Sequence, residues 1–230
     1  MKTEIEEKSS GVEVKYVVCD YSKFDSTAQS TVLSAIKDLD IGILINNVGI
    51  SYPYPKYFHE LNDEQVLNLM EMNVNSTTIM TKMVIGGMVE RKRGAILNLA
   101  SAAGTITSPL LAEYSAAKGF VEKFSRGLNA EYMSKGIFVQ CQVPFYVATK
   151  LAKRRKSFDC PTPDEYVVMG MKWIGQSDSV CSPFWLHSLQ GYVMSVLPTS
   201  FVVGQTFAVH QSIRKRGMKK EAAKKAEKAE

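Results

Sequence analysis

The sequence lacks the features that mark several large classes of protein. Its four cysteines include no Cys-x-x-Cys pair, so the spacing predicts neither a metal site nor a disulfide framework, and we expect reduced, structural thiols. The N-terminal residues are charged rather than apolar, which argues against a signal peptide. The net charge is only +5, much of it near the C-terminus, so we expect no nucleic-acid partner. With 45% hydrophobic and 22% charged residues, the chain instead fits one ordinary α/β domain with a buried core.

Charged residues are absent from one long segment. Between Asp178 and Arg214 there is no Asp, Glu, Lys or Arg. On neither side of Pro198 does the apolar run reach the roughly 20 residues of a membrane-spanning helix. The segment is therefore interpreted either as a buried core or substrate-channel wall, or as a membrane-contacting surface. The adjoining basic residues favour membrane contact, because they suit anionic headgroups. We accordingly divide the chain into an α/β domain (1–178), an apolar segment (179–213) and a basic polar tail (214–230).

The hydrophobic pattern alternates between strands and helices, as in a parallel sheet. Strands are predicted at 12–19, 43–45, 95–99 and 137–143. Helices are predicted at 2–8, at 26–39, from Asn62 or Asp63 to Gly86-Gly87, around Tyr114 as far as Gly136, and from Pro163. The loop from Ile50 to Phe58 is rich in proline and tyrosine and is expected to be irregular.

The stretch from Ala95 to Lys118 carries the chemistry. Ser101 follows a short apolar strand, at the carboxyl end where ligands bind in an open α/β sheet. A small-residue loop (102–104) is predicted next, and then a helix. Tyr114 and Lys118 are four residues apart on that helix, so their side chains share a face. A serine, a tyrosine and a lysine that converge in this way indicate carbonyl redox chemistry.

Tyr-x-x-x-Lys alone is a weak motif, because it occurs three times in this sequence. The copy at Tyr52 contains two prolines, which disfavour a helix and remove the shared face. The copy at Tyr146 follows Pro144 and is predicted to lie in a loop. Only Tyr114 has a helix and the upstream Ser101, so we select it over the alternative of an ordinary half-buried helix tyrosine.

Several chemically distinctive residues follow one another in a characteristic order: Asn46-Asn47-Val48-Gly49, Asn73, Ser101, Tyr114 and Lys118. This combined pattern resembles the short-chain dehydrogenase/reductase family over nearly the whole chain. The segment 144–153 is similar to one branch, the very-long-chain 3-oxoacyl-CoA reductases, which are related to 17β-hydroxysteroid dehydrogenase type 12. The apolar segment around Trp185 and the basic tail also fit that branch.

The resemblance implies NADPH-dependent reduction of a 3-oxoacyl-CoA, as in fatty acid elongation, or of a steroid ketone. Tyr114 would be the general acid. The charge of Lys118 would lower the pKa of that phenol from about 10, and Lys118 would also hold the nicotinamide ribose. Ser101 would hydrogen-bond the substrate carbonyl. Asn73 would position a water behind Lys118 in a proton relay.

The same resemblance implies further cofactor contacts. Asp20, at the end of its strand, would meet the adenine, while Asn47 and Gly49 would let the backbone approach the cofactor. Val147 and Thr149 would contact the nicotinamide side. With Asn73, Tyr114 and Lys118 these residues form the predicted NADPH site. The resemblance also implies an endoplasmic reticulum membrane location and a homodimer surface on the helices that begin at 62 and 112.

One family feature is missing from the sequence. The family normally opens with a strand, a Thr-Gly-x-x-x-Gly-x-Gly turn that holds the cofactor pyrophosphate, a helix and a second strand. The chain therefore resembles an N-terminally truncated form: a Rossmann-like doubly wound parallel sheet without its first strand-helix-strand unit, whose neighbours should show exposed edges. Two interpretations stay open, a reductase or an inactive membrane-associated or dimerising partner. Cofactor binding separates them.

Overall fold

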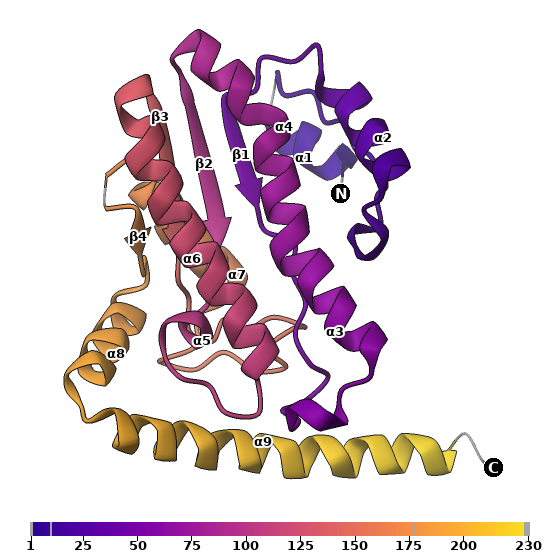
Figure 1. Cartoon of the computed structure of the whole chain (residues 1–230), viewed down its shortest axis with the longest axis vertical. Coiled ribbons are helices and arrows are strands. Elements are labelled where there is room, and N and C mark those ends of the chain that lie inside the picture. Colours follow the sequence, from indigo (N-terminus) through magenta and orange to yellow (C-terminus); the bar gives the residue numbers. More distant parts are fainter. Residues whose placement is uncertain (1, 10, 177, 228–230) are drawn as a thin grey trace. The chain divides into compact units, whose positions relative to one another are not determined.

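The computed structural model describes residues 2–9, 11–176 and 178–227, which divide into two compact units, one up to Leu39 and one from Asp40 onward. The second unit contains a four-stranded parallel sheet in the order β1-β2-β3-β4 (Figure 1). Its strands are β1 (Ile43–Asn46), β2 (Gly94–Leu99), β3 (Ile137–Gln142) and β4 (Val180–Cys181). The predicted α/β fold with a parallel sheet is confirmed, and only the two-residue β4 was missed.

Helices cover both faces of β3. Side chains alternate between the two faces along a strand. On one face, Cys141 packs in a buried cluster with Val121 of α6 (Ala112–Tyr132). On the other face, the Gln142 side chain donates to the Gly170 carbonyl of α7 (Pro163–Trp173) at 2.9 Å. The sheet is therefore doubly wound, as the sequence predicts, and the capping box at the start of α7 is also present.

The helix predicted from Asn62 is divided by one wide turn. Asn62 caps α3 (Asp63–Met70), a π-helical turn spans Glu71–Asn75, and α4 (Ser76–Arg91) follows. The glycine pair at 86–87 does not end the helix, which continues for another turn. A π turn inside an α-helix often marks a functional position. Here it contains Asn73, which is fully buried.

The first unit corrects one strand prediction. It contains α1 (Lys2–Lys8), the short 3-10 helix Tyr21–Lys23 and α2 (Ser26–Ile36). Residues 12–20 form no strand, and Val18 is 88% exposed. The alternating pattern favours an extended chain, but a strand also needs a neighbour to receive its hydrogen bonds. No strand occurs among the described residues of this unit.

The edge of the sheet at β1 shows the exposure that the sequence predicts. β1 pairs with β2 along one side only, and it is the terminal strand of the sheet. Ile43 and Ile45 point to the same face and are 55% and 48% exposed. Such exposure is unusual for isoleucine in a parallel strand, since both faces of these sheets are ordinarily covered.

The C-terminal region forms α8 (Trp185–Val196) and α9 (Thr199–Glu227), which lies across the lower end of the second unit in Figure 1. The basic tail is helical and anchored as far as the structure describes it; residues 228–230 lie outside the described residues. Arg214 binds the Glu60 carboxylate through two hydrogen bonds of 2.6 and 2.5 Å, and the Tyr54 hydroxyl donates to Glu221 at 2.5 Å. In the described residues, no helix is both long enough and apolar enough to cross a membrane.

Candidate active site

Ser101 lies just beyond the end of β2 and begins a turn of helix. Its hydroxyl accepts a hydrogen bond from the Ala103 amide at 3.2 Å and so caps α5 (Ala102–Thr105). The predicted small-residue loop at 102–104 is therefore wrong. The small residues serve close packing instead, because a Cβ on Gly104 would lie 2.5 Å from backbone atoms of α6. This contact holds the Ser101 turn against the helix that carries Tyr114.

The Ser101 hydroxyl lies beside the Tyr114 phenol and lowers its pKa, but burial acts more strongly in the other direction, and the net pKa is raised. The expectation that Lys118 lowers this pKa is therefore wrong for this structure. Its ammonium lies 5.9 Å from the centre of the Tyr114 ring, and burial of the phenol is the main cause of the raised pKa.

Lys118 is held in place inside the protein. Its side chain is buried, with the residue only 6% exposed, and its ammonium donates to the Leu99 carbonyl at 2.9 Å. Burial lowers the pKa of Lys118 to about 8, because the charged form loses its hydration. A lysine in this environment can gain or lose its proton near neutral pH, which suits a proton relay.

Asn73 and Gly49 border the same small space as Lys118. The Asn73 amide nitrogen donates to the carbonyls of Leu69 and Ile50 at 2.9 and 3.0 Å. Its Oδ1 atom is buried and has no hydrogen-bond partner among the described residues. A Cβ on Gly49 would lie 2.7 Å from that oxygen and 3.1 Å from the Lys118 nitrogen. The unsatisfied Asn73 oxygen therefore lies close to the buried Lys118 amine and to the Gly49 backbone. This arrangement suits a relay water or a ribose hydroxyl.

The two other tyrosines of the repeated motif lie in loops, as predicted. The Tyr52 hydroxyl accepts from the backbone amide of Glu113 at 3.0 Å, so it caps the first turn of α6. The Tyr146 ring lies 3.7 Å from the Arg154 guanidinium carbon, and Tyr146 is close enough to Tyr114 to contribute to the rise of its pKa. Neither tyrosine shares a helix face with its lysine, so the choice of Tyr114 agrees with the geometry.

The other predicted cofactor-binding residues are Asn47, Val147, Thr149 and Asp20. Asn47 is exposed just after β1, and Val147 and Thr149 lie in the loop after β3. The Thr149 hydroxyl accepts from the Ala152 amide at 3.2 Å, which orders that loop. Asp20 belongs to the first unit, where its carboxylate accepts from the Ser22 amide and caps the following 3-10 turn.

A buried polar ladder beneath the site was missed at the level of sequence. The Asn46 amide donates to Asn98 at 2.8 Å, and Asn98 donates to Ser125 at 2.8 Å. These bonds tie β1, β2 and α6 together. A signal was available, since each asparagine follows three apolar or small residues in a short strand and a buried polar group needs a partner.

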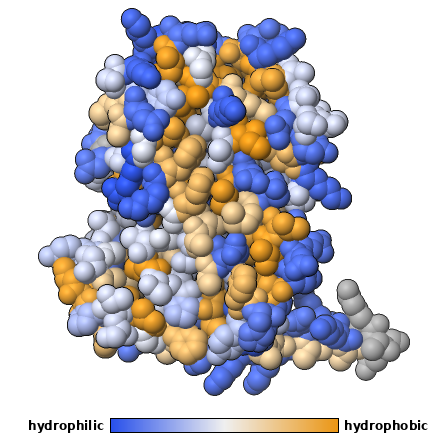
Figure 2. Space-filling model, in the orientation of Figure 1, coloured by the Kyte–Doolittle hydropathy of each residue, from blue (hydrophilic) through white to orange (hydrophobic). Residues whose placement is uncertain are grey.

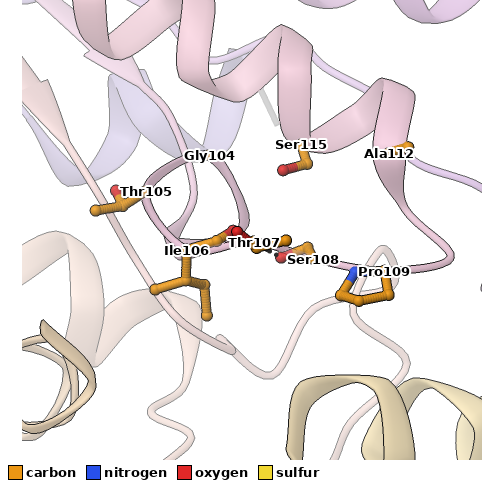
Figure 3. Close-up of a pocket in the computed structure, with 8 residues that line it drawn as sticks. All are labelled: Gly104, Thr105, Ile106, Thr107, Ser108, Pro109, Ala112 and Ser115. Atoms are coloured by element: carbon orange, nitrogen blue, oxygen red, sulfur yellow. Dashed lines mark hydrogen bonds between the residues drawn. The ribbon is translucent and has the colours of Figure 1, made fainter. Parts of the chain in front are cut away.

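A cavity of about 320 Å³ lies beside the start of α6 (Figure 3). Its walls carry no charged side chain, and none of the predicted site residues lines it. It is formed by Gly104, Thr105, Ile106, Thr107, Ser108, Pro109, Ala112 and Ser115. The Ser115 hydroxyl donates to the Ala103 carbonyl at 2.5 Å, so this side of α6 fastens α5 rather than facing the reacting groups.

Comparison with known proteins decides the family. The family model described as short chain dehydrogenase matches residues 1–159. The chain belongs to the short-chain dehydrogenase family. The family is one of oxidoreductases, in agreement with the Ser101, Tyr114 and Lys118 geometry.

This short-chain dehydrogenase has well-matched relatives. It is 44% identical over 220 residues to the very-long-chain 3-oxoacyl-CoA reductase of Anas platyrhynchos, which covers 94% of this chain and 69% of that relative. It is 40% identical over 223 residues to the reductase of that name from Homo sapiens, covering 96% of this chain and 70% of the relative. Both relatives are longer than this chain, which agrees with the prediction that it resembles a truncated form of the family.

Solved structures support the same fold. A short-chain dehydrogenase from Sphingobium yanoikuyae in complex with NADPH matches with a TM-score of 0.71 at 25% identity, covering 86% of this chain and 81% of that one. A 7β-hydroxysteroid dehydrogenase matches with a TM-score of 0.78, covering 89% of this chain and 80% of that one. The latter is only 21% identical, so its likeness shows the fold alone.

Proposed function

We propose that this short-chain dehydrogenase reduces a 3-oxoacyl-CoA with NADPH. The observation that carries the proposal is the group formed by Ser101, Tyr114, Lys118 and Asn73 at the carboxyl end of the sheet. The substrate class follows from the two relatives of 40% and 44% identity, both called very-long-chain 3-oxoacyl-CoA reductases. A steroid ketone is the alternative substrate, since the same group would serve any ketone.

Each residue has a role that its position allows. Reduction of a ketone creates an alkoxide, which must be stabilised and protonated. The raised pKa of Tyr114 keeps its proton available for that oxygen. Ser101, beside the phenol, would orient the carbonyl toward it. Lys118 then returns a proton to Tyr114, and the free Oδ1 of Asn73 would hold the water that resupplies the lysine from the interior side.

The residues present fit the reactive end of a nicotinamide cofactor. Bound NADPH supplies the hydride. Lys118 and Asn73 would hold its ribose through the amine and the unsatisfied oxygen, and Gly49 leaves space beside them. Val147 and Thr149 would contact the nicotinamide side, and Asn47 with Gly49 would let the backbone approach the cofactor.

Cofactor binding tests the proposal first. Titration of the purified chain with NADPH, followed by tryptophan fluorescence, should show saturable binding. Consumption of NADPH should then depend on added 3-oxoacyl-CoA, with a steroid ketone as the parallel assay. A folded protein that binds no NADPH would contradict the proposal and favour the inactive, membrane-associated or dimerising partner. Binding with turnover of the steroid alone would replace the substrate.

We also propose that the protein docks on the endoplasmic reticulum membrane through α8 and the start of α9. An exposed apolar stripe runs along α8 at helical spacing: Trp185, Leu189, Tyr192 and Val196 are 58%, 50%, 66% and 63% exposed. Aromatic side chains of this kind suit a membrane interface. Hydrophilic side chains gather around the C-terminal half of α9, where the basic residues lie (Figure 2).

Vesicle binding tests this surface. We expect the variant Trp185→Ser/Tyr192→Ser/Val196→Ser to lose most of its co-flotation with vesicles that contain anionic lipid. A matched control is Val167→Ser/Val168→Ser/Met171→Ser on α7, because these residues are equally exposed, at 56%, 59% and 52%. Equal flotation of both variants and the unmodified chain would show that α8 does not contact the membrane.

A further inference from the structure

The loop that follows Thr149 is strongly basic and has no part in the reaction described above. Residues 150–156 read Lys-Leu-Ala-Lys-Arg-Arg-Lys, with five cations in seven positions. The structure places them in a turn (150–153) and the irregular chain after it, between β3 and α7, and four of the five side chains are exposed. A like-charged cluster of this density repels itself unless carboxylates or a bound anion offset it.

The structure accounts for three of the five cations. The Lys156 ammonium pairs with the Glu165 carboxylate. The Arg154 guanidinium stacks on the Tyr146 ring at 3.7 Å. The Lys153 ammonium donates to the Pro53 carbonyl at 2.8 Å, which links this loop to the proline-rich loop.

Two cations remain without such contacts. Lys150 and Arg155 are exposed, and neither forms a hydrogen bond or ion pair with any described residue. The neighbouring carboxylate that could serve them, Asp159, accepts instead from the Ser157 hydroxyl at 2.6 Å. The loop therefore presents Lys150 and Arg155 without partners among the described residues, whereas its other three cations already have contacts within the protein.

The basic loop lies next to the catalytic tyrosine. The Pro144 carbonyl accepts from the Ala102 amide at 2.9 Å, so the chain leading into the loop contacts the residue beside Ser101. Tyr146, two positions further on, is close enough to Tyr114 to raise its pKa, and the Tyr146 ring also carries the stacked Arg154. A ketone held at Ser101 and Tyr114 is thus flanked by a cationic surface.

We propose that Lys150 and Arg155 bind the phosphate groups of the CoA moiety of the substrate. The inference rests on the proposed reductase function and names the residues that would recognise an acyl-CoA. In a 3-oxoacyl-CoA the reacting ketone lies close to the thioester, and the pantetheine arm carries the phosphates away from it. Arginine and lysine are the usual donors to phosphate oxygens, and the two here are free to turn toward them. A steroid has no phosphate, so this loop would favour the acyl-CoA.

Binding of free coenzyme A to the full chain tests the inference without any need for turnover. We expect Lys150→Glu/Arg155→Glu to weaken calorimetrically measured CoA binding at least about tenfold, because two charge-assisted hydrogen bonds are replaced by repulsion. The matched control is Lys82→Glu/Lys123→Glu, which makes the same change of net charge at two exposed lysines on α4 and α6. The control should bind CoA as the unmodified chain does.

Parallel ligands identify the source of the phosphate. NADPH affinity should be nearly the same in both variants and the unmodified chain, and an equal loss for NADPH and CoA would overturn the assignment. If the loop variant lost binding to anionic vesicles but kept its CoA binding, the loop would be a lipid site and the CoA assignment would be overturned. The assignment would also be overturned if the unmodified chain bound no CoA. Where the chain is active, a 3-oxoacyl N-acetylcysteamine thioester, which has no phosphate, should be reduced equally by the loop variant and the control. A chain that binds CoA through this loop and yet reduces nothing would uphold the inference and reject the reductase proposal.

Discussion

Tyr114→Phe is expected to abolish ketone reduction while NADPH affinity stays nearly unchanged. The substitution removes one hydroxyl, the group that would donate the proton to the alkoxide and that lies beside Ser101. General acids of this kind contribute about 10²–10⁴-fold to a rate. The ring stays in place, so its packing beside Lys118 is kept. Turnover of a 3-oxoacyl-CoA and a fluorescence titration with NADPH measure the two quantities separately.

The sequence supplies two matched controls for this variant. Tyr146→Phe keeps the ring that stacks on Arg154, and Tyr52→Phe removes only the hydroxyl that caps α6. We expect both to retain turnover, with Tyr52→Phe less stable by about 1 kcal/mol because the amide of Glu113 loses its acceptor. Unaltered turnover in Tyr114→Phe would refute its assignment as the acid. A loss of equal size in either control would show that another copy of the motif is catalytic.

The grouping of Ser101, Tyr114 and Lys118 could be predicted from sequence because its geometry is local. Tyr114 and Lys118 share a helix face by spacing alone, and Ser101 follows a strand whose apolar run is unambiguous. The prediction at 12–19 failed for the opposite reason: strand formation depends on a distant partner that the local pattern does not contain. The turn at 102–104 failed because Gly104 is selected by its contact with α6, and a tertiary contact of this kind overrides local propensity.

Burial and protonation were the least predictable features of the site. The role predicted for Asn73 came from the family resemblance, and helical periodicity does not show that it lies buried in a π turn with one oxygen unsatisfied. The pKa of Tyr114 depends on two opposing effects, desolvation by burial and the Ser101 side chain, whose balance is set by packing around the ring. A motif shows which groups lie together, but the direction in which their pKa values shift depends on the surrounding structure.

Lys118→Met is expected to make the folded protein more stable at pH 7. The pKa of Lys118 falls from 10.5 to about 8 on folding, so its charged form is disfavoured inside the protein. At 1.36 kcal/mol per pKa unit this burial costs roughly 3 kcal/mol below pH 8. Loss of the hydrogen bond to the Leu99 carbonyl lowers the stability gained by about 1 kcal/mol. The net gain in unfolding free energy is roughly 2 kcal/mol, at the expense of catalysis.

The sign of the pH dependence distinguishes this explanation from a simple packing effect. Between pH 8 and 10.5 the unfolded chain binds more protons at this lysine than the folded one, so the stability of the unmodified protein rises with pH through that window relative to the variant. The advantage of Lys118→Met, measured by urea unfolding, should therefore shrink across it and vanish by its upper end. Lys123→Met, at an exposed lysine of the same helix, should show no such trend. If Lys118→Met were less stable than the unmodified chain at pH 7, the buried ammonium would support the fold. If its gain in stability did not change with pH, the cost of burying Lys118 would not come from its charge.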